Sequence, residues 1–261
     1  MQKLTFNRSI FLDSSDVSEI EKWSSCGIID GVTTNQTIML KDGLKLNQVK
    51  PTIKTICKIM KGKPVSVELT DSKATVEQMV SEAKKYRSIA ENIVVKVPMI
   101  PSEIKSLVVI RKLHNLNIPV NITAIMTYEQ LIMAALASKD HPFPSFISLF
   151  WCRSIEDHER YRTNKAFLKS HEILGLESDV NSHPGKIVMA IIDFIKDGGY
   201  IHPKLIIGSI RKVSEVGEAF AAGANIATIP PKILEAMLYS ERTIETNSDL
   251  DNSWITLKSQ S

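Results

Sequence analysis

Ile93-Val94-Val95-Lys96-Val97-Pro98 is a short run of β-branched and apolar residues that a single lysine interrupts. Strands this apolar are typical of parallel sheets whose two faces are both covered. Seven further runs of this kind recur along the chain, and each precedes a polar break and a segment with helical periodicity. This pattern indicates parallel strands joined by crossover helices. The expected strands are residues 9–15, 27–35, 64–70, 92–98, 119–126, 145–152, 204–211 and 225–230.

Eight β–α units within 261 residues predict one closed (β/α)₈ TIM barrel, because this fold takes about 250 residues. We therefore expect a single α/β domain over residues 1–261. The first loops lack a G-x-G-x-x-G sequence, so no nucleotide site is indicated. Residues 156–185 are expected to form an insertion after the sixth strand, with a short helix near residues 166–173. The tail is expected to contain a helix near residues 250–257, with Trp254 as an anchor on a neighbouring surface.

The composition restricts the classes of partner. Apolar residues make up 43% of the chain, and 32 lysines and arginines face 29 aspartates and glutamates. An excess this small does not create the field that nucleic-acid binding needs, whereas small anionic substrates remain compatible with it. No apolar stretch approaches the length of a membrane span,. The three cysteines follow no metal-ligand pattern and indicate a reducing compartment,, so we expect a cytoplasmic protein.

Lys96 is the first candidate for chemistry. It lies inside a strand that should be covered on both faces, and burial disfavours the charged ammonium. The neutral amine is then available as a nucleophile toward a carbonyl carbon. The alternative is a lysine at the strand end whose amine reaches the surface and pairs with a carboxylate.

Two carboxylates end other strands. Asp13 either caps the following helix or points over the barrel mouth, and Ser15 is the better cap candidate because it lies closer to that helix,. Glu68 follows Val67 in an apolar strand, where the alternative is an exposed residue on the barrel rim.

Further polar side chains gather at the same ends of the strands. Alternation with period two predicts that each of three pairs of residues shares one face of its strand. Arg153 follows just beyond the sixth strand. In barrels the active site lies at the carboxyl ends of the strands, and a phosphate site often follows strands seven and eight. A guanidinium suits phosphate oxygens. The three pairs are Thr33 with Asn35, Asn121 with Thr123, and Ser209 with Arg211.

Seven motifs, in order, resemble those of the transaldolase family, within which the chain is most similar to small transaldolases and fructose-6-phosphate aldolases. The resemblance covers about residues 9–240 and excludes the insertion, and the V-V-K-V-P run is its most specific part. The motifs are Leu12-Asp13-Ser14, Val32-Thr33-Thr34-Asn35, Val65-Ser66-Val67-Glu68, Ile93-Val94-Val95-Lys96-Val97-Pro98, Asn121-Ile122-Thr123, Ile147-Ser148-Leu149-Phe150-Trp151-Cys152-Arg153 and Gly208-Ser209-Ile210-Arg211.

The resemblance implies catalytic roles at the matching positions. Lys96 would form an iminium with C2 of a ketose, and Asp13 would take and return the proton of the C4 hydroxyl. Glu68 and Thr123 would hold a water that relays protons. No metal or other cofactor is required. The family also implies sugar metabolism of the pentose phosphate type and assembly into a ring-shaped homo-oligomer.

The resemblance also implies the binding roles. Residues that would hydrogen-bond substrate hydroxyls are Thr33, Asn35, Asn121 and Ser148, and residues that would grip the terminal phosphate are Arg153, Ser209 and Arg211. Members similar to fructose-6-phosphate aldolase carry Gln in place of Glu68 and Tyr in place of Phe150. Since Phe150 has no hydroxyl to help protonate an enamine, loss of the three-carbon fragment to water should be slow.

Three departures from the family pattern bear on specificity. Gln36 stands where the family has Pro, and the stretch from Leu149 to Cys152 replaces a Pro-Phe-x-Gly pattern. These changes alter loop stiffness near the substrate, and the insertion adds material there. The donor could therefore be a modified or sulfonated ketose. Two other functions stay open: an aldolase that releases free dihydroxyacetone, and a sugar-phosphate-binding barrel without turnover.

Overall fold

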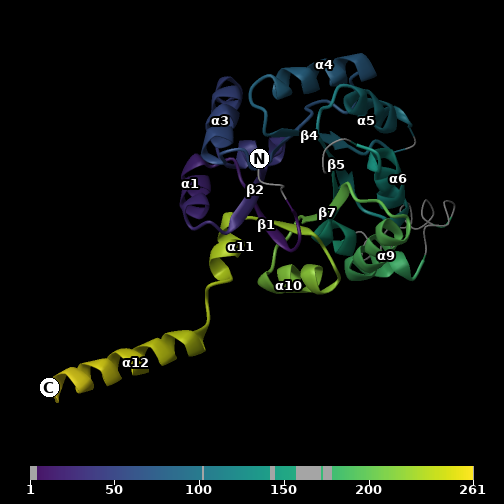
Figure 1. Ribbon diagram of the computed structural model, residues 1–261. Helices are drawn as coiled ribbons and strands as arrows, with labels where there is room; N and C mark the ends of the chain where they lie inside the picture. Colours follow the sequence, from purple (N-terminus) through teal and green to yellow (C-terminus); the bar gives the residue numbers. More distant parts are fainter. Residues whose placement is uncertain (1–4, 102, 142–144, 157–171, 173–177, 261) are drawn as a thin grey trace.

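The computed structural model describes residues 5–101, 103–141, 145–156, 172 and 178–260. Eight parallel strands pair in sequence order and close into a barrel, which the helices surround (Figure 1). The expected (β/α)₈ barrel is confirmed, and each strand lies within one residue of its predicted range. The strands are β1 Ser9–Asp13, β2 Ile29–Thr33, β3 Val65–Glu68, β4 Ile93–Pro98, β5 Val120–Ile125, β6 Ser145–Phe150, β7 Pro203–Gly208 and β8 Ile226–Ile229.

The helices pack apolar faces on the outside of the strands. In α4, for example, Met79, Val80 and Ala83 are buried, and Thr75 caps the first turn by accepting from the backbone N–H of Gln78,. The helices described are α1 Val17–Ser25, α2 Gln36–Lys41, α3 Leu46–Ile59, α4 Val76–Arg87, α5 Lys105–Asn115, α6 Tyr128–Ser138, α9 Pro184–Asp197, α10 Val213–Ala221, α11 Pro231–Ala236 and α12 Glu241–Ser259, with a 3₁₀ turn η1 at Val180–Ser182. None of them is long and apolar enough to cross a membrane.

The start of α1 corrects one expectation. Ser15 was the better cap candidate, but Asp16 is the cap, accepting from the backbone N–H groups of Ser18 and Glu19. The reason is that Ser15 has another partner: its N–H and its hydroxyl both donate to Asp42 Oδ2, at 2.8 Å each. Asp13 is therefore not needed as a cap and stays at the barrel mouth.

The lower half of the barrel interior is an apolar plug. Phe11, Phe146 and Phe6 contact one another edge to face, with ring centroids 5.2–5.7 Å apart. Inward-facing Val94, Ile206 and Ile226 complete this buried cluster. Gly31 lies beside the Phe11 ring, where an added Cβ would come within 2.5 Å of Cε2. The plug leaves only the upper interior layers, toward the carboxyl ends of the strands, for polar groups.

The insertion after β6 lies mostly outside the described residues, and the expected helix of the C-terminal tail is present but longer than predicted. The helix expected near residues 166–173 lies outside the described residues, apart from Glu172, and α9 begins at Pro184. The C-terminal helix α12 begins already at Glu241, and none of its residues is buried. Figure 1 shows α12 extending away from the barrel after α11. Trp254, expected to be an anchor, is 59% exposed and does not pack on the barrel of its own chain.

Replacing Gly31 by alanine should destabilise the barrel by about 1–3 kcal/mol, because the new methyl group meets a Phe11 ring that its aromatic neighbours hold in place. Gly217 in α10 is the matched control, since an added Cβ there meets nothing within 4 Å. Gly217→Ala should raise stability by up to about 1 kcal/mol through helix propensity. Urea unfolding of the two variants measures both changes. Equal effects would contradict the plug geometry.

Candidate active site

A pocket of about 320 Å³ opens at the carboxyl ends of the strands. Strands β1 to β8 all contribute to its wall or rim, as expected for this fold. Of the site residues expected from the sequence, all but Asn121 and Arg211 line it. These lining residues are Asp13, Thr33, Asn35, Glu68, Lys96, Thr123, Ser148, Phe150, Arg153 and Ser209, and Gln36, Ala124, Gly208 and Thr228 join them.

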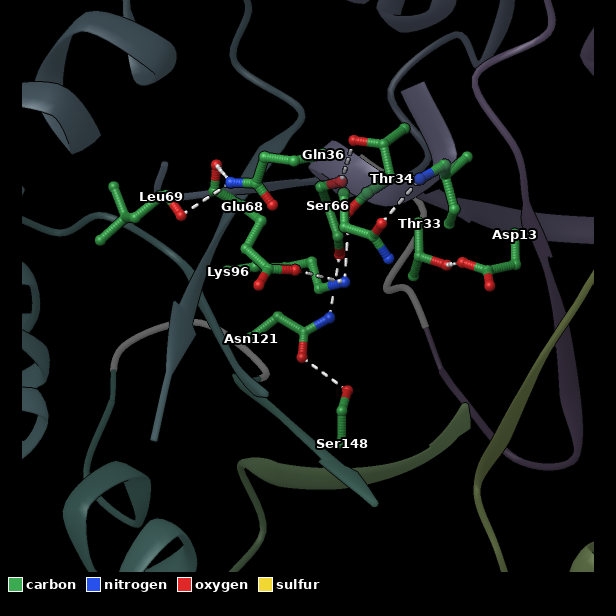
Figure 2. Close-up of polar contacts among 12 residues, drawn as sticks. Asp13, Thr33, Thr34, Gln36, Ser66, Glu68, Leu69, Lys96, Asn121 and Ser148 are labelled. Carbon is green, nitrogen blue, oxygen red and sulfur yellow. Dashed lines mark hydrogen bonds and ion pairs between the residues drawn. The ribbon is translucent and has the colours of Figure 1, made fainter. Parts of the chain in front are cut away.

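Lys96 is buried in the pocket floor, with 4% of its surface exposed. Its Nζ lies 3.1 Å from Glu68 Oε2 and donates to the backbone carbonyl of Thr34 at 3.2 Å. The β3–β4 register sets Glu68 opposite Lys96, so the two side chains meet (Figure 2). The amine therefore does not reach the surface, and Glu68 is not a free residue of the barrel rim.

Asp13 faces the same pocket from β1. Thr33 Oγ1 donates to Asp13 Oδ1 at 2.5 Å. Burial raises the pKa of the Asp13 carboxyl; the positive charge of Lys96 and the Thr33 hydrogen bond oppose this rise, and the charges of Glu68 and Asp42 add to it. A carboxyl with a raised pKa is suited to accept a proton and give it back.

Thr228 is a residue that the sequence analysis missed. Its Oγ1 lies 2.5 Å from Thr33 Oγ1, and only 5% of its surface is exposed. The signal was available, because alternation with period two turns Thr228 inward between Ala227 and Ile229, as it turns Thr33 inward in β2.

A second hydrogen-bonded group supports the pocket wall below Ser148. The Ser148 hydroxyl donates to Asn121 Oδ1 at 2.7 Å, and Asn121 Nδ2 donates to Ser66 Oγ at 3.1 Å. Asn121 is fully buried, and Figure 2 shows it between Ser66 and Ser148. In this arrangement Asn121 orients Ser148, which is the member of the group that lines the pocket.

Strand β5 is irregular where it meets the site. Its register with β6 shifts between Ile122 and Ile125, and Ala124 has a φ of 59°, which is uncommon for a residue with a side chain. Such an irregularity re-aims a neighbouring side chain. The Thr123 hydroxyl is buried in the pocket wall and has no hydrogen-bond partner among the described residues.

Two polar residues tie the loop after β2 to its surroundings. Asn35 Oδ1 accepts from the backbone N–H of Ile38 at 2.9 Å and caps α2, so its amide nitrogen is the group left to donate to a ligand. Gln36 Nε2 donates to the carbonyl of Leu69 at 2.9 Å, which links the start of α2 to the end of β3 (Figure 2).

The opposite rim carries the cationic residues. Arg153 lines the pocket, and its Cζ lies 5.8 Å from the centre of the Phe150 ring. Ser209 also lines the pocket, with a φ of 59°. Arg211 does not line it: its side chain is 53% exposed and forms an ion pair with Glu156.

The expected shared face of Ser209 and Arg211 is therefore wrong. Strand β7 ends at Gly208, so alternation with period two does not continue through these residues. Glu215 holds the backbone conformation of this segment instead, because its Oε2 accepts from the N–H groups of Arg211 at 2.8 Å and Lys212 at 3.0 Å. The thiol of Cys152 also donates to Glu215 at 3.2 Å. Burial and this hydrogen bond raise the pKa of Cys152 to about 11, which keeps the thiol protonated.

The arrangement defines a class: a (β/α)₈ barrel with a buried lysine, two neighbouring carboxyl groups and a cationic rim around one pocket. Among the described residues, no group of three or more His, Cys, Asp or Glu side chains could hold a metal ion. The family model for "Transaldolase/Fructose-6-phosphate aldolase" matches residues 10–260. The chain belongs to this family.

Individual relatives agree with that assignment. "Probable transaldolase 2" of Listeria monocytogenes is 35% identical over 220 residues, which are 84% of each chain. "Probable transaldolase" of Clostridium tetani is 32% identical over 228 residues, 87% of this chain and 89% of the relative. Among solved structures, dihydrodipicolinate synthase from Rhodopseudomonas palustris superimposes with a TM-score of 0.54 at 12% identity, covering 87% of this chain and 72% of the other. That likeness concerns the fold alone.

The raised pKa of Asp13 predicts a pH-dependent gain in stability for Asp13→Asn. The pKa of this carboxyl is higher in the folded state than its ordinary value of 3.8, which applies to the unfolded chain. Such a group contributes its full stabilisation below pH 3.8 and loses it as the pH rises through the pKa of the folded state,. The neutral amide has no such loss. The stability of Asp13→Asn relative to the unchanged protein should therefore increase between pH 4 and pH 8 in urea unfolding.

Asp16→Asn is the matched control for this experiment. Its hydrogen bond with Ser18 lowers the pKa of Asp16, so the Asp16 carboxylate stabilises the fold above the ordinary value and loses this effect as the pH falls. The stability of Asp16→Asn relative to the unchanged protein should therefore stay nearly constant between pH 4 and pH 8, because this whole range lies above the ordinary value of 3.8,. If Asp13→Asn is equally constant over this range, burial is not what controls Asp13.

Proposed function

We propose that the chain is a transaldolase that transfers a three-carbon dihydroxyacetone unit from a ketose phosphate, or a modified ketose, to an aldose acceptor through a Schiff base on Lys96. One observation carries the proposal: the buried amine of Lys96 lies 3.1 Å from Glu68 in a pocket that Asp13 also lines. No cofactor takes part in the proposed reaction.

Formation of the Schiff base needs a neutral amine. Glu68 is close enough to accept a proton from the Lys96 ammonium, after which the amine attacks the C2 carbonyl and water leaves. The Thr123 hydroxyl, which is free of protein partners among the described residues, is suited to hold a water with Glu68. That water would carry protons during formation and hydrolysis of the iminium.

Bond cleavage then needs a base and an electron sink. The Asp13 carboxylate takes the proton of the C4 hydroxyl as the C3–C4 bond breaks, and the bonding electrons move to the protonated imine. The carbanion is thereby stored as a neutral enamine. The fragment that carries C4 leaves as an aldehyde. An acceptor aldehyde then adds to the enamine, Asp13 returns the proton to the new hydroxyl, and hydrolysis of the imine releases the product and Lys96.

Substrate binding divides between the two sides of the pocket. Thr33, Asn35 and Ser148 would hydrogen-bond substrate hydroxyls. Asn121 would orient Ser148 through their hydrogen bond. Arg153 and Ser209 would bind the terminal phosphate from the opposite rim. Arg211 would join them by turning from Glu156 toward the anion, which offers a bidentate partner for its guanidinium.

Phe150, which lies beside Arg153, favours transfer over release of free dihydroxyacetone. Phe150 lines the pocket and has no hydroxyl with which to protonate the enamine, so the enamine should persist until an aldehyde arrives. A barrel that only binds sugar phosphates is less well supported, because burying an amine and a carboxylate costs free energy even when the two are paired, and binding alone does not need this pair.

Borohydride reduction tests the central step. Incubation with a panel of ketose phosphates should add the mass of a reduced donor to the protein, and Lys96→Arg should abolish this addition because guanidinium is not a usable nucleophile. Lys112→Arg, a surface control, should leave it intact. Undiminished trapping in Lys96→Arg would rule out the proposed mechanism. Turnover as fast without an acceptor aldehyde as with one would instead indicate the aldolase.

We also propose a cytoplasmic homo-oligomer of the ring type. The three cysteines are free thiols, as a reducing compartment would leave them. Helix α12 exposes Leu250, Trp254 and Leu257 without packing on its own barrel, and apolar side chains gathered in this way are typical of an association surface. Sedimentation equilibrium should give a multiple of 29.1 kDa. The mass of a single chain at micromolar concentration would overturn this part of the proposal.

A further inference from the structure

Three side chains from three strands form a short chain of oxygen atoms at the pocket wall. Thr228 Oγ1 lies 2.5 Å from Thr33 Oγ1, which donates to Asp13 Oδ1 at 2.5 Å. Both threonines are almost fully buried, with exposed fractions of 5% and 2%. We propose that Thr228 is a positioning residue, which holds the Thr33 hydroxyl in the orientation that serves Asp13. This inference rests on the proposed role of Asp13 as the proton acceptor.

The donor and acceptor properties of the groups fix the direction of the chain. An ionised carboxylate can only accept, and a hydroxyl has one hydrogen to donate. The Thr33 hydrogen must therefore point to Asp13, and Thr33 Oγ1 is then an acceptor toward Thr228. It follows that Thr228 donates to Thr33 and Thr33 donates to Asp13. A hydrogen bond received by Thr33 strengthens the one that it donates.

Packing limits the rotation of Thr228 itself. An added Cβ on Gly208 would lie 3.5 Å from Thr228 Cγ2, so the methyl group faces the neighbouring strand β7 with little free space between them. Because Thr is branched at Cβ, the position of the methyl group also determines where the hydroxyl points.

The charges around Asp13 explain why such support matters. Lys96 on β4 favours the carboxylate, but Glu68 on β3 and Asp42 after α2 disfavour it, and burial disfavours it most strongly. Thr33 supplies a hydrogen bond directly to the carboxylate, and bonds to a charged acceptor are stronger than bonds between neutral groups. Loss of Thr228 would weaken this bond and raise the pKa of Asp13.

The first experiment compares the pH dependence of kcat for Thr228→Val and the unchanged protein. Valine keeps the shape and removes the hydroxyl. Since Asp13 must be ionised to take the proton, kcat of the variant should fall by about twofold to tenfold on the acidic limb, the effect of one neutral hydrogen bond. The loss should shrink toward higher pH, and Thr228→Ser should restore the original profile. An equal loss at every pH would assign Thr228 a structural role and overturn the proposal.

A double-mutant cycle tests whether Thr228 acts through Thr33. In a Thr33→Val background, Thr228→Val should change kcat by less than about twofold at any pH. Losses that multiply independently would overturn the proposal. Ser138→Ala removes another buried hydroxyl, which donates to the Ala134 carbonyl in α6, and should leave the pH dependence unmoved. If Thr228→Val does not fold, Thr228→Ala supplies the same comparison.

Borohydride trapping separates this inference from the proposed function. The Thr228 and Thr33 variants should still trap a ketose phosphate on Lys96, because imine formation does not require Asp13 to take the C4 proton. Trapping that survives Lys96→Arg would refute the proposed function, whereas normal trapping combined with a uniform kcat loss in Thr228→Val would refute the role of Thr228 alone.

Discussion

The contact between Lys96 and Glu68 depends on strand register, and the rest of the site depends on that contact. Placing a lysine and a carboxylate inside a barrel removes both from water, which costs free energy unless the two groups are paired and hydrogen-bonded. The register of β3 and β4 sets them opposite each other, and the Thr34 carbonyl accepts a further bond from the amine. A shift of either strand by one residue would turn its own side chain to the outside of the barrel, so the register is itself a requirement for chemistry.

The interior of the barrel has an apolar lower part and a polar upper part, toward the carboxyl ends of the strands. Phe6, Phe11 and Phe146 fill the lower part and supply the apolar burial from which the fold gains stability. Above them, Ser66, Asn121 and Ser148 form a hydrogen-bonded group that supports the pocket wall. Non-glycine residues with positive φ stand at two pocket positions, Ala124 in β5 and Ser209 after β7. Local strain of this kind tends to occur where a site demands a backbone that the strand alone would not adopt.

Much of this organisation could be predicted from the sequence, because a parallel barrel obeys two simple periodicities. Apolar runs located the eight strands, and alternation within them predicted the faces of Thr33 and Thr123, which both line the pocket. The same rule would have found Thr228. It failed after Gly208, where the strand ends and the backbone turns through Ser209.

The remaining features required three-dimensional information. Glu215 lies beyond a strand, in the first turn of α10, and its role depends on the distance to backbone N–H groups of a preceding loop. No periodicity encodes such a contact. The ion pair of Arg211 with Glu156 likewise joins residues far apart in the chain. The beginning of α12 at Glu241 was missed because its apolar residues are spread over a long polar segment, and a pattern of this kind gives a weak helical signal.

Helix α12 makes the chain thermodynamically heterogeneous. Its 19 residues bury nothing, so heating the chain exposes no new apolar surface there, and the segment adds little to the heat capacity of unfolding. Most helical stability in proteins comes from packing of an apolar face, so within a single chain little holds α12 in helical form. The apolar surface that the chain buries lies instead in the barrel and its surrounding helices. A melting temperature therefore reports on the barrel and not on the arm that leaves it.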